Sequence, residues 1–323
     1  MAEKKVLKSF RTGDKELRVE KFVFGSGSPV CGILSGVHGD EVLARKVSKR
    51  FMEVLEDRSL SGSVHIVPEA NVFACDEDRR LTPWPKYEKN EGEMRDLNRC
   101  FEIAMENMSS QNSLNITQIL ARDILKDFKS MDFVLDLHNA TSGGVKVNQA
   151  RLKVSNGMSQ EVISEMEDIA VNSGADFVMS SAPSWLGGTV SSILPLFGVP
   201  VVTFEVSGGG QHEKKDFEMY LKFLENVMKH RDIFEGDTVS NNPFFFDDIE
   251  SIYSNSYGCL ETYVDLGEFV DEGDVIAEIF SEKGVKKETV KSCFEGFVES
   301  LTDSEKVFEG TRIANIGLKE AFK

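Results

Sequence analysis

Short apolar runs alternate with amphipathic stretches along the first two thirds of the chain, which predicts strands separated by helices. The expected strands span residues 17–24, an edge strand, and 29–36, 63–68, 132–137, 176–180 and 199–206. The expected helices span residues 115–128, 161–172, 189–196 and 213–230, and a further helix begins at Glu41 with apolar residues at helical spacing. This order is typical of an α/β sheet with helices on both faces.

The pattern changes after Arg231, where glycine-punctuated runs of β type replace the alternation. A polar stretch over residues 235–248 is a plausible boundary, so we expect one domain over residues 1–235 and a second over 236–323. The second contains an internal repeat, in which Gly258 recurs as Gly296 and Gly273 as Gly310. Two similar β units of this size predict a small pseudo-symmetric all-β barrel.

Charge excludes two classes of partner. The formal net charge is −17 and the sequence pI is near 4.8, whereas nucleic acids and anionic membrane surfaces require a basic face. A small anionic substrate is not excluded, because a few placed arginines and a metal ion can dominate locally.

Neither a signal peptide nor a membrane-spanning apolar run is expected from the sequence, which favours the cytoplasm. The cysteines are scattered and form no CxxC pair, so we expect reduced thiols that behave as small buried apolar residues. They are Cys31, Cys75, Cys100, Cys259 and Cys293.

Candidate chemistry lies at the ends of three predicted strands. His38 and Glu41 follow the first buried strand at a spacing of i, i+3, and His138 follows another. Two imidazoles and one carboxylate form a known ligand set of catalytic zinc, which leaves a fourth position for water. Glu205, at the end of the last strand, is then available as a base for that water. The alternative for Glu205 is a carboxylate that caps the following glycine loop or pairs with a lysine. We expect His65, His212 and His230 to be ordinary loop or core residues.

Four motifs in this order resemble the aspartoacylase and succinylglutamate desuccinylase family. They are HxxE at 38–41, DLNRCF at 96–101, DLHNATS at 136–142 and FEV at 204–206. The resemblance covers residues from about 30 to 210 and implies a zinc hydrolase with a carboxypeptidase-like mixed sheet flanked by helices. The C-terminal part looks like the β-barrel appended in this family, which is related to biotinyl and lipoyl domains.

The resemblance also implies a role for each motif residue. His38, Glu41 and His138 would bind one zinc ion per chain, and Glu205 would activate its water. The residues implied to bind substrate are Asn98, Arg99 and Asn139. Family spacing places the arginine that polarises the scissile carbonyl at position 80, and Arg79 and Arg95 stay open as alternatives to Arg80.

The sequence departs from the family at substrate recognition. Aspartoacylase has a second arginine about ten residues before its catalytic glutamate, whereas this chain has Pro195 there and no arginine from residue 152 to 230. We therefore expect N-acetylaspartate to be a poor substrate, and a compound with one carboxylate or with a polar or cationic side chain to be better.

The function predicted from the sequence is hydrolysis of a small N-acylated amino acid, its partner being that small molecule, with a homo-oligomer possible. One alternative is a zinc carboxypeptidase acting on short peptides. The other is a non-catalytic binding or carrier protein, although the lysines between the two β units, at 283, 286 and 287, lack the flanking residues of a biotinyl or lipoyl site.

Overall fold

The computed structural model describes residues 2–83, 95–109, 114–141, 144–180, 187–207, 213–239 and 242–319. The N-terminal strands are β1 (Glu3–Thr12), β2 (Lys15–Gly25), β3 (Val30–Leu34), β4 (Ser63–Val67), β5 (Phe133–Asn139), β6 (Val145–Lys146), β7 (Gln149–Leu152), β8 (Phe177–Ser180) and β9 (Val201–Val206). The helices are α1 (Val42–Glu56), α2 (Val72–Asp76), η2 (Leu97–Arg99), α3 (Phe101–Glu106), α4 (Ile116–Phe128), α5 (Gln160–Val171), α6 (Val190–Ile193), η4 (Leu194–Phe197) and α7 (Glu213–His230). The C-terminal strands are β10 (Phe244–Tyr253), β11 (Gly258–Thr262), β12 (Phe269–Val270), β13 (Val275–Phe280), β14 (Lys286–Lys291), β15 (Gly296–Leu301), β16 (Lys306–Val307) and β17 (Arg312–Lys319).

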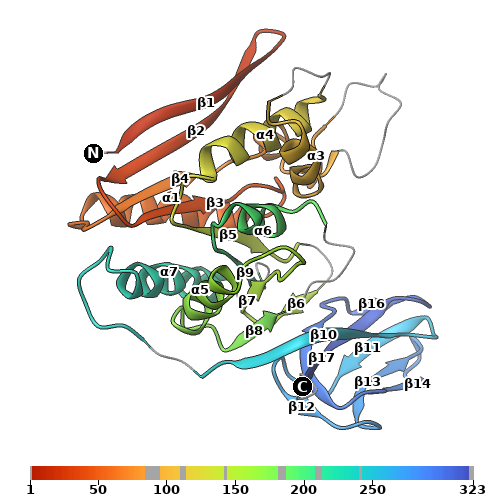
Figure 1. Cartoon of the computed structure of the whole chain (residues 1–323). Coiled ribbons are helices and arrows are strands. Elements are labelled where there is room, and N and C mark those ends of the chain that lie inside the picture. The colour runs from red at the N-terminus through yellow and green to blue at the C-terminus, as the bar shows by residue number, and fades with distance from the viewer. Residues whose placement is uncertain are drawn as a thin grey trace.

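One mixed sheet forms the centre of the described part of the molecule. Its strand order is β1-β2-β4-β3-β5-β9-β7-β8-β10-β17-β15-β12, and β6 pairs with β15 (Figure 1). Strands β4, β3, β5 and β9 run parallel, so their carboxyl ends share one edge. Every residue of β5 is buried, as expected for a parallel strand covered on both faces.

Helices cover both faces of this sheet. On one face, α1, α5 and α7 bury apolar side chains, including Phe51, Met166 and Phe223. On the other face, α3, α4 and α6 do the same, with Phe101, Leu120 and Val190. The predicted fold class is therefore confirmed as a mixed sheet flanked by helices, with an antiparallel β-rich region at the C-terminus.

The predicted edge strand over residues 17–24 is wrong in its position. It is β2, which lies inside the sheet because β1 pairs with it antiparallel and forms the edge. Most residues of β1 are exposed and many are charged, so it shows neither an apolar run nor clear alternation. Strands β6 and β7 were not predicted either, since they are two and four residues long.

The C-terminal region repeats one β unit, as predicted. In the first unit Gly258 pairs with Val307, and in the second Gly296 pairs with Val270, so each unit contributes a strand to the other's sheet. A Cβ at Gly258 would lie 2.2 Å from the Phe280 carbonyl oxygen, and one at Gly296 would lie 2.4 Å from that of Gly317. Because neither contact leaves room for a side chain, both glycines are required where the strands cross.

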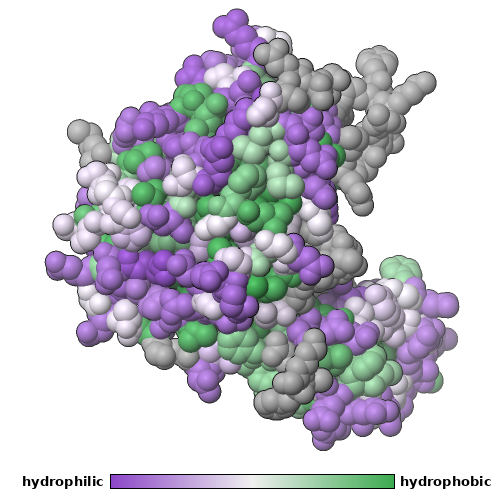
Figure 2. Space-filling view, in the orientation of Figure 1, coloured by the Kyte–Doolittle hydropathy of each residue, from purple (hydrophilic) through white to green (hydrophobic). Residues whose placement is uncertain are grey.

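The sheet continues across the predicted boundary at residues 235–236, which itself stays a prediction. Strand β10 pairs parallel with β8 and antiparallel with β17, and so joins the two parts. Phe297 stacks on Phe177 at 4.6 Å and contacts Phe246 at 5.0 Å between ring centroids, which adds an aromatic contact at the joint. Figure 2 shows the C-terminal region as a separate lobe at the lower right, with hydrophilic residues over much of its visible surface.

All five cysteines are free, as predicted. Cys31, Cys75 and Cys100 are buried and Cys259 is half-buried, whereas Cys293 is exposed. The prediction of burial is therefore wrong for Cys293, which lies in a turn between β14 and β15. No helix among the described residues is long and apolar enough to cross a membrane.

Candidate active site

The turn between β3 and α1 places His38 and Glu41. Gly39 lies in this turn, donates its N–H to the Arg79 carbonyl at 2.9 Å, and has no space for a side chain, since a Cβ would lie 2.0 Å from the Ala74 oxygen. The turn is thereby fixed against α2. Glu41 immediately precedes α1 but makes no side-chain capping bond to the helix, so its carboxylate is available for the site.

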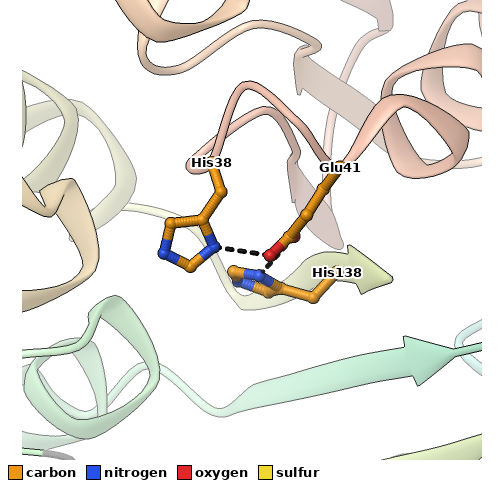
Figure 3. Close-up of side chains that lie close together, drawn as sticks. All are labelled: His38, Glu41 and His138. Carbon is orange, nitrogen blue, oxygen red and sulfur yellow. Dashed lines mark hydrogen bonds and ion pairs between the residues drawn. The ribbon is translucent and has the colours of Figure 1, made fainter. Parts of the chain in front are cut away.

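The three predicted metal ligands converge in a buried position (Figure 3). One oxygen of Glu41 lies 2.6 Å from Nδ1 of His38, and the other lies 2.7 Å from Nδ1 of His138. The ligand atoms of all three residues are within 4.8 Å of one another. At these distances each imidazole nitrogen can share a proton with the carboxylate, and a metal ion bound by the same atoms would replace those protons. The N, N, O donor set suits Zn²⁺.

Two further carboxylates hold the imidazoles in orientation. Nε2 of His38 lies 3.0 Å from Asp96, and Nε2 of His138 lies 3.1 Å from Asp136. An Nε2–H that donates to a carboxylate fixes the tautomer and leaves the Nδ1 lone pair facing Glu41, as in carboxylate–histidine–metal arrangements. Asp96 and Asp136 were not predicted as site residues, although both lie in the motifs, two residues before Asn98 and His138.

The electrostatics of this cluster favour a bound cation. Burial lowers the pKa of His138, but Asp136 and Glu41 raise it by more, so the pKa lies well above its ordinary value. Burial raises the pKa of Glu41, but His138 and His38 lower it more, so that the carboxylate stays ionised. The acids thus hold positive charge between the imidazoles, and a divalent metal can supply that charge in place of protons.

Glu205 lies beside this cluster, on the neighbouring strand. It is in register with His138 across the β5–β9 ladder and lines the same cavity. Lys146 approaches one of its oxygens at 3.6 Å and Arg151 the other at 3.7 Å. Burial raises the pKa of Glu205, but these two cations lower it more, so the group is a carboxylate near neutral pH. The lysine partner of the alternative interpretation is therefore present, and the glycine loop at 208–210 lies outside the described residues.

A buried acid from the C-terminal region holds the same two cations. Glu299 on β15 is fully buried and accepts from Gln149 at 2.7 Å, Arg151 at 3.3 Å and Asn315 at 3.2 Å. Lys146 lies 3.9 Å away. Burial raises the pKa of Glu299, but Lys146 and Arg151 lower it more, to about 2. Glu299 therefore connects the second β unit to the cations beside Glu205.

Glu299→Gln should lower the free energy of unfolding by up to about 3–5 kcal/mol at pH 7, because it removes the fully buried one of the two acids that balance Lys146 and Arg151. A depressed pKa stabilises the fold above the unfolded value near 4.3, and this contribution is lost as the pH falls towards about 2. The difference from the unmodified protein should therefore shrink below about pH 5. Urea unfolding across this range measures it, with exposed Glu295→Gln as the control. Equal stability of both variants at pH 7 would contradict the account.

Of the three candidate arginines, only Arg80 lies in the site. Its guanidinium is 3.4 Å from Glu41 and 3.9 Å from Asp96, and it lines the cavity. Arg79 pairs instead with Glu77, and Arg95 donates to a backbone carbonyl away from the cavity. The arrangement therefore favours Arg80 over both alternatives.

The three residues implied to bind substrate also line the cavity, and each makes a hydrogen bond within the protein. Asn139 accepts from the Ala44 N–H at 3.0 Å, within the first turn of α1. Asn98 accepts from the Val190 N–H at 3.3 Å, at the start of α6. Arg99 donates to the carbonyl of Asn98 at 2.8 Å. Among these three, Arg99 has the side chain with most donors left for a ligand.

The cavity encloses about 290 Å³ and combines residues of both parts of the chain. The C-terminal region contributes Ser300, Leu301, Thr302, Arg312, Ile313 and Ala314. Strand β7 and the residue after it contribute Arg151 and Lys153, which lie in none of the four sequence motifs. Arg151 and Lys153 therefore offer positive charge to a second carboxylate of a ligand, although no arginine occurs from residue 152 to 230.

Comparisons with known proteins identify a family and relatives that this chain resembles. Residues 29–231 match the family described as succinylglutamate desuccinylase/aspartoacylase catalytic domain. The N-alpha-acetyl-L-2,4-diaminobutyric acid deacetylase of Halomonas elongata is 24% identical over 262 residues, covering 78% of this chain and 70% of that protein.

Solved structures agree over nearly the whole chain. The product-bound ectoine utilization protein of Ruegeria pomeroyi superposes with a TM-score of 0.77 at 18% identity, covering 96% of this chain and 93% of that one. A succinylglutamate desuccinylase from Silicibacter gives a TM-score of 0.77 at 20% identity, covering 98% and 95%. At sequence identities this low, the similarity to these solved structures shows a shared fold alone.

Proposed function

Because the chain belongs to the succinylglutamate desuccinylase/aspartoacylase family, we propose that it is a zinc-dependent deacylase that hydrolyses the amide bond of a small N-acyl amino acid. The observation that carries the proposal is the convergence of His38, Glu41 and His138 within 4.8 Å, with Glu205 in register beside His138. Three such ligands with an adjacent carboxylate are the set that metal-assisted hydrolysis requires.

The reaction adds water across the amide and yields a carboxylate and an amine. When bound, zinc acts as a Lewis acid and lowers the pKa of water at the site to about 7. Glu205, held as a carboxylate by Lys146 and Arg151, accepts a proton from the attacking water and passes it to the leaving nitrogen. His38 and His138 keep their orientation through Asp96 and Asp136.

Arg80 supplies the fixed positive charge for the carbonyl oxygen. Its guanidinium borders both Glu41 and the cavity, and nearly half of its side chain is exposed, so donors remain for a ligand. A preorganised cation stabilises the negative charge that develops on the carbonyl oxygen as the amide is attacked.

The size of the cavity favours small acylated compounds over peptides. Its volume of about 290 Å³ is at the lower limit for ligand sites, and the C-terminal region forms one wall. A peptide substrate needs an open groove on both sides of the scissile bond. The relative from Halomonas is named for a substrate of the small acylated kind.

Release of free amine from a panel of N-acetylated and N-succinylated amino acids and short peptides tests this proposal. We expect turnover of acylated single amino acids and little of peptides. N-acetylaspartate belongs in the panel because Arg151 and Lys153 in the cavity wall would attract an acidic side chain. N-acetyl-2,4-diaminobutyrate belongs in it because the relative from Halomonas is named for that compound, whose side chain is cationic. A clear preference for peptides would support the carboxypeptidase alternative, and no turnover by zinc-loaded protein would contradict the proposal.

A further inference from the structure

Two acids from distant segments share the same two cations beside the cavity. One guanidinium nitrogen of Arg151 lies 3.7 Å from Glu205, and another lies 3.3 Å from Glu299. The Lys146 ammonium group also lies between these acids, 3.6 Å from Glu205 and 3.9 Å from Glu299. The four side chains therefore form a cluster in which two positive and two negative charges balance.

Within this cluster the two acids are held differently. The contacts of Glu205 with the cations, at 3.6 Å and 3.7 Å, are too long for hydrogen bonds, and no other described cation forms an ion pair with it. Arg151 instead donates a hydrogen bond to Glu299, at 3.3 Å. The cations thus lie near Glu205 without occupying its carboxylate oxygens, which a base needs free to accept a proton.

Glu299 is fixed by further contacts on its own side. Its carboxylate is fully buried and accepts hydrogen bonds from Gln149 at 2.7 Å and from Asn315 at 3.2 Å. The Val147 N–H also donates to its backbone carbonyl, at 2.8 Å. A buried acid held at this many points cannot follow the cations, so it keeps Arg151 on its own side of the cluster.

We propose that Glu299 is a positioning residue for the reaction, because it holds Arg151 and Lys146 back from Glu205 and so keeps that carboxylate free to accept a proton. The inference rests on the proposed deacylase function. Glu299 does not line the cavity, so it acts through the two cations and touches no substrate. Without its charge, both cations would have one acid left, and each could close on Glu205 and occupy its oxygens with charge-assisted hydrogen bonds.

The kinetic test compares Glu299→Gln with the unmodified protein, using the preferred compound of the N-acyl panel and rates per folded, zinc-loaded chain. Glutamine keeps the size of the side chain and removes its charge. A misplaced group can cost about 10²-fold in rate, so we expect kcat to fall at least about tenfold while KM changes by less than about threefold. Glu295→Gln removes an exposed charge from the same region and should leave both constants unchanged.

A second substitution separates positioning from a purely structural role. Adding Lys146→Met to Glu299→Gln leaves one cation and one acid, so the charges balance again. We expect this double variant to be at least about threefold faster than Glu299→Gln, within the range of couplings between neighbouring residues. A residue that only joins the two regions would give a double variant no faster than the single one, and that result would overturn the proposal.

Glu299→Asp replaces Glu299→Gln if the latter does not fold. It keeps the charge but withdraws the carboxylate from Arg151 by one methylene group. Arg151 is then less firmly held away from Glu205, so kcat should still fall at least about threefold. An unchanged kcat in the variant that folds would overturn the proposal.

Crystal structures of the unmodified protein and of the same variant test the arrangement without turnover. In the variant, Arg151 should donate to Glu205 at about 2.7–3.2 Å, whereas in the unmodified protein this contact should stay too long for a hydrogen bond. That shift would stand even if no N-acyl compound were hydrolysed, in which case the proposed function alone would fail. Unchanged positions of both cations would refute the role of Glu299 and leave the proposed deacylase in place.

Discussion

Glu205→Gln should lower kcat by about 10²–10⁴-fold, the usual effect of losing a general base. Glutamine has almost the same shape but cannot accept the proton of the attacking water. Lys146 and Arg151 keep their second acid, Glu299, so the surrounding strands should remain in place. The measurement is the rate of amine release at saturating substrate, accompanied by zinc analysis and a thermal unfolding curve.

Two outcomes of this experiment are decisive. Retained zinc and fold with the expected loss of rate would support Glu205 as the base. Near-normal turnover would leave Glu205 as an ion-pair partner of Lys146 and Arg151 and move the role of base to another residue. Glu295→Gln, an exposed acid in the C-terminal region, is the matched control and should turn over normally.

His138→Ala should lose most of the bound zinc, and amine release should fall with it. The residue supplies one of three ligands, and its removal leaves Glu41 with a single imidazole partner. Asp136 would also lose the ring nitrogen 3.1 Å from its carboxylate and remain as a buried acid. Zinc per chain, measured after dialysis against a weak chelator, gives the result.

His230→Ala is the control for the histidine variants, because that side chain pairs with Asp168 on the surface and lies outside the cavity. It should keep its zinc. If His138→Ala and His38→Ala both retained a full complement of zinc, the metal site would have to be elsewhere.

The site residues that local sequence predicted are those that a strand end fixes. His38, His138 and Glu205 each follow or end a buried strand whose apolar run is visible in the sequence, and the parallel sheet brings those ends together. The family motifs supplied the arginine assignment, and the structure brings Arg80 to Glu41 at 3.4 Å.

The remaining site residues depend on contacts between distant segments. Lys146 and Arg151 lie on strands of two and four residues, too short for a detectable period. Glu299 reaches them from about 150 residues away, within a β-type run whose other residues are largely apolar. Strand β1 was missed for a related reason, since it gains its pairing from β2 and not from an apolar pattern of its own.

The most direct test of the zinc-dependent deacylase is a titration of zinc into metal-free protein, followed by release of free amine from the preferred compound of the N-acyl panel. Activity should be near zero without metal, rise in proportion to added zinc and level off at one ion per chain. The Glu205→Gln protein should bind the same amount of zinc and stay at least about 10²-fold less active. Undiminished turnover by the metal-free protein would contradict the account.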